Sequence, residues 1–127
     1  MTYLEKAKTL REDEGVHYNC FQAVLLPFCE EYGLDPDAAM RAGTFLNAGM
    51  RHGSTCGAVA GALAVLGLAE QDNQAGPELL RRFREKNGAL ACAELLKAAA
   101  DRGEERKLHC DRMVYDAVRM VEQLLKE

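Results

Sequence analysis

Two glycines inside a helix-forming segment constrain this chain most. They belong to the run Cys56-Gly57-Ala58-Val59-Ala60-Gly61. Because Gly57 and Gly61 are four residues apart, they share one face of a helix and leave a groove without side chains there. Each glycine destabilises a helix interior by roughly 0.5–1 kcal/mol relative to alanine. Close packing of a second helix or close approach of a cofactor or substrate would offset this loss, and the pattern favours the two explanations equally.

The composition favours packed α-helices in one domain. The chain has 127 residues, a length typical of a single domain with a core of its own. Alanine and leucine are abundant, aromatic residues make up only 6% of the chain, and tryptophan is absent. This balance favours helices over strands. We therefore expect residues 1–127 to form a single all-α domain that carries the cysteines.

Hydrophobic spacing and turn residues divide the chain into a bundle of six or seven helices. The clearest apolar stripe runs through residues 16–32, and the pair Asp35-Pro36 is a good helix start. A long loop, residues 43–55, precedes the helix that contains the two glycines. The predicted helices cover about residues 2–14, 16–32, 36–43, 56–69, 78–87, 92–99 and 109–126.

Charge and apolar patterning exclude several classes of protein. The net charge of −4 argues against a nucleic-acid-binding surface, which needs a basic face. The first residues do not resemble a secretory signal, and no apolar run approaches the ~20 residues that span a bilayer. We therefore expect a cytoplasmic protein without a membrane span. In that reducing compartment, cysteines favour metal binding or redox chemistry over structural disulfides.

Four cysteines lie at or near the core-facing stripes of four different helices. They are Cys20, Cys56, Cys92 and Cys110, separated by 36, 36 and 18 residues. This spacing contains no Cys-x-x-Cys pair, which excludes a zinc ribbon and a thioredoxin-type motif. A bundle can still bring four such thiols to one end. There they would hold an iron–sulfur cluster or zinc, or form two dithiol pairs without a metal.

Cys56 stands at the start of a helix, where outward-pointing N–H groups and the helix dipole favour a thiolate. We therefore predict Cys56 as the reactive, catalytic thiol, and Gly57 and Gly61 as points where a cofactor approaches the backbone. Cys29, the fifth cysteine, shares the apolar stripe of the second helix and is expected in the core.

Each histidine lies close in sequence to one of the four cysteines. His17 precedes Cys20, His52 precedes Cys56, and His109 is followed directly by a cysteine. An imidazole near a thiol can bind the same metal or lower the pKa of that thiol. Chance proximity explains this pattern better than a functional role does.

The segment 56–61 resembles the signature of the C-GCAxxG-C-C family, whose members are described as redox-active. The flanking residues agree with that family: Asn19-Cys20 upstream, then Cys92 and Cys110 in order, so that the resemblance extends from about Tyr18 to Leu125. It implies that the four family cysteines are those named above and that Cys29 is additional. Relatives often carry a glycine run before Met50, whereas this chain keeps only Gly49 there.

Three functions remain open on this basis. The first is a redox protein whose four cysteines bind an iron–sulfur cluster or another metal and transfer electrons to a redox partner that the sequence does not identify. The second is a metal-free thiol–disulfide protein with Cys56 as its thiolate. The third is a structural zinc site or a helical interaction module, without catalysis. The Ala/Gly-rich helix after Cys56 would also support a homodimer.

Overall fold

The computed structural model describes residues 1–127 and is helical throughout, which confirms the all-α prediction. It has eight helical segments, one more than the predicted maximum of seven. Seven are α-helices, and the additional one, η1, is a five-residue turn within the predicted loop. Their bounds are α1 Tyr3–Glu12, α2 Cys20–Cys29, α3 Pro36–Gly43, η1 Gly49–Gly53, α4 Gly57–Leu68, α5 Ala75–Asn87, α6 Cys92–Asp101 and α7 Arg106–Lys126.

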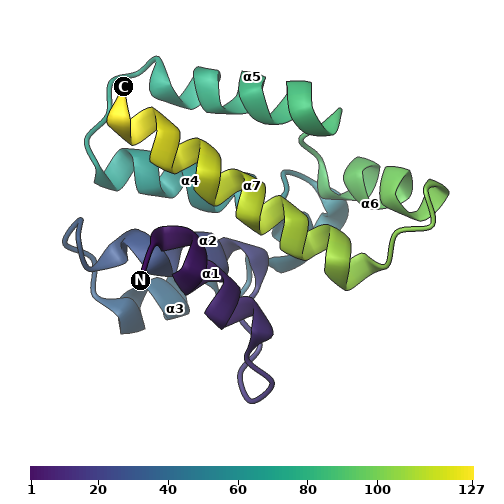
Figure 1. The fold of residues 1–127 in the computed structure, drawn as a ribbon, viewed down its shortest axis with the longest axis horizontal. Coiled ribbons are helices and arrows are strands. Elements are labelled where there is room, and N and C mark those ends of the chain that lie inside the picture. The colour runs from purple at the N-terminus through teal and green to yellow at the C-terminus, as the bar shows by residue number, and fades with distance from the viewer.

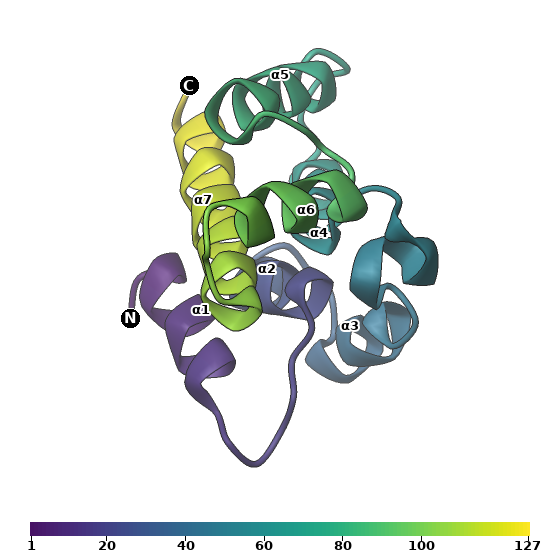
Figure 2. The ribbon, with the colours of Figure 1, turned by 90° about the vertical axis from the view of Figure 1, so that its right-hand side faces the viewer.

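The helices surround one hydrophobic core. α7, the longest helix, crosses the molecule with α5 on one side and α1 to α3 on the other (Figure 1), and a second view separates α5, α6 and α3 from one another (Figure 2). α2 and α4 pack together beneath α7 and supply much of the core. Its largest fully buried side chains include Phe28, Phe83, Leu79 and Met113. None of the helices combines the length and the apolar character needed to cross a membrane.

Several helix boundaries differ from those that apolar spacing predicted: α2 ends at Cys29 rather than at residue 32, α5 begins at Ala75 rather than at residue 78, and the starts of α2 and α7 also move. α2 begins at Cys20 rather than at residue 16, because Asn19 caps it. The Asn19 side chain accepts a hydrogen bond from the backbone N–H of Gln22, and the Gln22 side chain accepts one from the N–H of Asn19. This reciprocal pair is a capping box, which fixes a helix start at one residue. α7 begins at Arg106 and therefore includes one more turn than expected.

The glycines of α4 allow α2 to pack closely against it. A Cβ atom on Gly61 would lie 2.9 Å from the carbonyl oxygen of Phe21 and 3.1 Å from the Cβ of Val24. These distances are too short for a side chain, so Gly61 is needed for helix packing. Gly67, in the same helix, has no atom within 4 Å of the equivalent position.

We predict opposite effects for alanine at these two glycines. Gly61→Ala should lower the free energy of unfolding by about 1–3 kcal/mol, because the added methyl group overlaps the backbone of α2. Gly67→Ala should raise it by about 0.5–1 kcal/mol, because alanine is the better helix former and nothing obstructs it. Urea unfolding of both variants measures the difference, and an equally stabilised Gly61→Ala variant would contradict the close packing.

Candidate functional site

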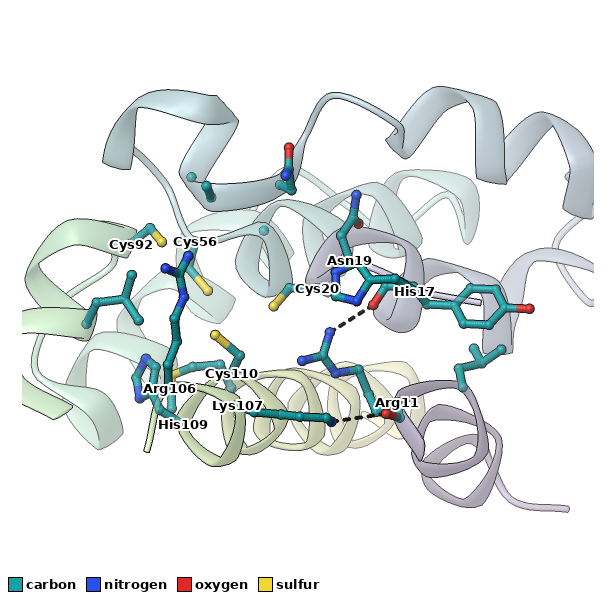
Figure 3. Close-up of a pocket in the computed structure, with 18 of the residues that line it drawn as sticks. Arg11, His17, Asn19, Cys20, Cys56, Cys92, Arg106, Lys107, His109 and Cys110 are labelled. Atoms are coloured by element: carbon teal, nitrogen blue, oxygen red, sulfur yellow. Dashed lines mark hydrogen bonds between the residues drawn. The ribbon is translucent and has the colours of Figure 1, made fainter. Parts of the chain in front are cut away.

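The four cysteines of the predicted site line one cavity. Its volume is about 660 Å³, and Cys20, Cys56, Cys92 and Cys110 all contribute to its wall. Figure 3 shows their sulfur atoms turned toward a common space. Residues up to 90 positions apart in the chain thus present thiols to the same cavity.

Three of these cysteines stand where a helix begins. Cys20 and Cys92 are the first residues of α2 and α6, and Cys56 is the residue that caps α4. Cys110 lies one turn into α7. The cavity is therefore built where several helices start close together, which places their free N–H groups on the same side as the sulfur atoms.

A pair of backbone hydrogen bonds holds the segments of Cys56 and Cys92 together. The N–H of Cys56 donates to the carbonyl of Leu90 at 2.8 Å, and the N–H of Cys92 donates to the carbonyl of Ser54 at 2.6 Å. These bonds form an isolated antiparallel bridge in which Thr55 is paired with Ala91. The bridge fixes the relative positions of two helix starts that are distant in sequence.

Gly57 and Gly61, for which the sequence predicted the same role, have different surroundings. Gly57 lines the cavity, and a Cβ atom there would lie 3.3 Å from the Cβ of Cys20 and 3.2 Å from the N–H nitrogen of Phe21. Gly57 thus lets Cys20 approach the start of α4. Gly61 does not line the cavity but faces Phe21 and Val24 of α2, so close helix packing explains this glycine.

A left-handed turn forms another part of the cavity wall. Ala48, Gly49, Met50 and Arg51 have φ angles of 51°, 62°, 60° and 68°, and the first two line the cavity. Left-handed backbone disfavours a non-glycine residue by roughly 1–2 kcal/mol. A Cβ atom on Gly49 would lie 2.6 Å from the Cβ of Cys92. The absence of a side chain at Gly49 therefore leaves the space that the side chain of Cys92 occupies.

Cys20 and Cys110 are neighbouring thiols, and each shifts the pKa of the other. Interaction with the Cys20 thiol lowers the pKa of Cys110 to about 6, although burial of the sulfur opposes this effect, and the nearby Arg11 and Arg106 lower it further. Interaction with Cys110, together with burial, raises the pKa of Cys20 well above its usual range. The pair therefore gives up its first proton more readily than an isolated thiol does, and this favours a thiolate at Cys110.

Cys56 does not have the lowered pKa that its position at a helix start predicted. Burial raises the pKa of its thiol to about 11, even though the nearby backbone N–H groups of Ala58 and Val59 act to lower it. The helix start therefore does not lower the pKa of Cys56 as expected. The role of Cys56 as the reactive thiol stays a prediction. Burial also raises the pKa of Cys92. The electrostatics of the cavity single out Cys110 instead.

The fifth cysteine lies outside the cavity, and the three histidines differ in their relation to it. Cys29 is 1% exposed and lies in the hydrophobic core, which confirms the packing role expected of it. His17 and His109 line the cavity, whereas His52 does not. His109 is buried, and burial lowers the pKa of its ring.

Sequence reasoning missed two arginines at the site. Arg106 precedes Cys110 by one helical turn, and its positive charge lowers the pKa of that thiol. The spacing of four residues was visible in the sequence, but the start of α7 had been placed after Arg106. Arg11 reaches the cavity from α1, and no local pattern relates it to a cysteine.

The donor set of the cavity fits a group that binds thiolates. Four thiols with two arginines beside them provide soft ligands and compensating positive charge. No three cysteine, histidine or acidic side chains are arranged around the position of a single metal ion. A mononuclear zinc site, which needs four converging ligands, therefore fits this arrangement poorly. An iron–sulfur cluster distributes its thiolates over more than one metal, so it does not require four of them around a single ion.

Comparison with known proteins agrees with the resemblance in the sequence. The family model described as "Putative redox-active protein (C_GCAxxG_C_C)" matches residues 18–124. No curated protein and no solved structure matches the chain. The family match includes all four cysteines of the cavity and most of the chain. The chain therefore belongs to the C_GCAxxG_C_C family of redox-active proteins.

Proposed function

We propose that the cavity is a redox centre in which Cys20, Cys56, Cys92 and Cys110 bind an iron–sulfur cluster. The observation that carries this proposal is the exposure of all four thiols to one cavity. The electrostatic contacts agree with it, because Cys110 influences the pKa of each of the other three thiols. When bound, such a cluster supplies one-electron transfer.

The residues of the chain have separate tasks in this proposal. Cys20 and Cys110 are neighbours that shift each other's pKa, and the backbone bridge holds Cys56 next to Cys92. Two such pairs match the demand of a two-iron cluster for two protein thiolates on each iron. Gly57 and Gly49 leave the space that these pairs need. Arg106 supplies positive charge beside Cys110.

A second candidate is thiol–disulfide exchange without a metal, and the low pKa of Cys110 favours it. The Cys110 thiolate would attack a sulfur of a substrate disulfide, forming a mixed disulfide and releasing one substrate thiolate. Cys20 would transfer its proton to that thiolate and attack the sulfur of Cys110. The second substrate thiolate then leaves, so the substrate disulfide has gained two electrons and the Cys20–Cys110 pair has lost them.

We expect the protein to bind iron and sulfide when it is loaded under anaerobic conditions. The loaded wild type should absorb visible light and contain iron and acid-labile sulfide in equal amounts. Serine at any one of the four cavity cysteines should reduce the bound iron to less than half, because each removes one ligand. Cys29→Ser is the matched control and should retain full loading, since Cys29 lies in the core away from the cavity.

Two outcomes would contradict the cluster. One is wild-type protein that stays colourless and free of iron after loading. The other is equal loss of iron in Cys29→Ser and in the cavity variants. A colourless wild type that forms a Cys20–Cys110 disulfide with a model disulfide would favour the second candidate.

For the metal-free, reduced protein we predict that Cys110 is the first thiol to be alkylated as the pH rises. Its rate of reaction with iodoacetamide should be half-maximal near pH 6, because the thiolate is the reacting form and the pKa of Cys110 is about 6. Cys56 should react slowly up to pH 9, since its pKa is about 11 and its side chain is buried. Peptide mass spectrometry distinguishes the two sites.

The variant Cys20→Ala provides the control for this assignment. Without the Cys20 thiol, which is the largest cause of the lowered pKa, the pH of half-maximal alkylation at Cys110 should rise toward the ordinary thiol value of about 8.5. Faster labelling of Cys56 than of Cys110 at pH 7 in the wild type would overturn the assignment of the thiolate.

A further inference from the structure

Arg11 is a buried cation that reaches the cavity from outside the part of the chain that matches the family. It belongs to α1, whereas the match begins at residue 18. Its side chain is held from both sides. Nε donates a hydrogen bond to Asp111 at 2.6 Å, and Nη1 donates one to the carbonyl of Tyr18 at 2.8 Å. The residue is only 9% exposed, so little water screens its charge.

The guanidinium of Arg11 is directed toward one pair of thiols. Figure 3 shows it on the same side of the cavity as Cys20 and Cys110. The charge of Arg11 acts on both of these thiols, because it lowers the pKa of Cys20 and of Cys110. The interaction therefore connects α1 with the starts of α2 and α7.

Asp111 does not cancel the positive charge of Arg11. The Nζ of Lys107 lies 3.0 Å from Asp111 and donates a further hydrogen bond to the backbone carbonyl of Arg11. Arg11, Lys107 and Asp111 together thus carry one net positive charge. Arg11 is the member that faces the sulfur atoms from within the protein, whereas Lys107 is more than half exposed.

We propose that Arg11 is a positioning residue that raises the reduction potential of the centre at Cys20 and Cys110. This inference rests on the proposed redox function. Reduction adds negative charge at the same place in either chemistry, as an electron on a cluster held by thiolates or as thiolates left when a disulfide accepts two electrons. A buried cation stabilises that added charge, and the low polarisability of its surroundings makes the effect larger than it is in water.

The test is the midpoint potential of four variants under anaerobic conditions. Arg11→Met keeps the aliphatic stem but removes the charge, and we expect it to lower the equilibrium constant for reduction at least tenfold. Tenfold corresponds to a shift of about −59 mV for a one-electron couple and about −30 mV for a two-electron couple. Arg11→Gln, which is also neutral but retains a hydrogen-bond donor, should shift the potential in the same direction.

Two further variants separate charge from structure. Arg11→Lys keeps the charge and should restore the equilibrium constant to within threefold of the wild type. Lys6→Met is the matched control, because it removes one positive charge from an exposed position on the same helix that does not line the cavity. It should change the equilibrium constant by less than twofold. Far-UV circular dichroism and thermal unfolding establish that each variant is folded.

The outcomes distinguish this inference from the function on which it rests. A wild type without any reversible couple overturns both. A wild-type couple that keeps its potential in Arg11→Met and Arg11→Gln overturns the role of Arg11 alone, as does an equal shift in Arg11→Lys. If Arg11→Met does not fold, Arg11→Gln and Arg11→Lys still give opposite expectations and decide the question.

Discussion

The absence of a side chain at Gly57 is the constraint on which the rest of the site depends. At this position α2 and α4 are so close that a Cβ atom would contact both the backbone of Phe21 and the Cβ of Cys20. Gly61, one turn further along, maintains the same close approach deeper in the core. The two glycines weaken α4 as an isolated helix, but they place the starts of two helices side by side. Cys20 and Cys56 consequently line the same cavity although 36 residues separate them.

The protonation of the four thiols depends on a competition between burial and neighbouring groups. A helix N-terminus stabilises a negative charge by about 0.3–1 kcal/mol at an exposed site, which is less than one pKa unit. This contribution does not overcome the burial of Cys56, and the pKa of its thiol rises to about 11. At Cys110, the neighbouring Cys20 thiol and two nearby arginines act together to lower the pKa, and their combined effect outweighs burial. Specific neighbouring groups, rather than position at a helix start, thus determine which sulfur is charged.

The sequence allowed the helices to be predicted from local spacing and the four cysteines to be selected from the family resemblance, whereas spacing only permitted those cysteines to converge. Apolar periodicity located all seven α-helices, and the family signature selected four of the five cysteines. Other features depend on contacts between distant segments. Apolar spacing placed the start of α2 too early, although Asn19 and Gln22 formed a visible capping box. The left-handed turn at residues 48–51 had no such signal, because alanine, methionine and arginine rarely adopt it. The role of Arg11 could not be predicted either, because only the folded chain brings α1 next to α7.

The two candidate chemistries make different demands on the protons of the cavity. Thiolates are the form that binds metals, so uptake of a cluster requires Cys20, Cys56 and Cys92 to lose protons that burial and the neighbouring thiols hold on them. Cys110 is the exception, because it is already deprotonated near neutral pH. Thiol–disulfide exchange needs only that one thiolate to begin. Above the pKa of Cys110, a further rise in pH no longer changes the reactivity of this thiol. It still favours cluster binding, because it deprotonates the other three cysteines. The raised pKa values of the other three thiols thus do not argue against metal binding. They predict that the affinity for a metal depends more strongly on pH than the reactivity of Cys110 does.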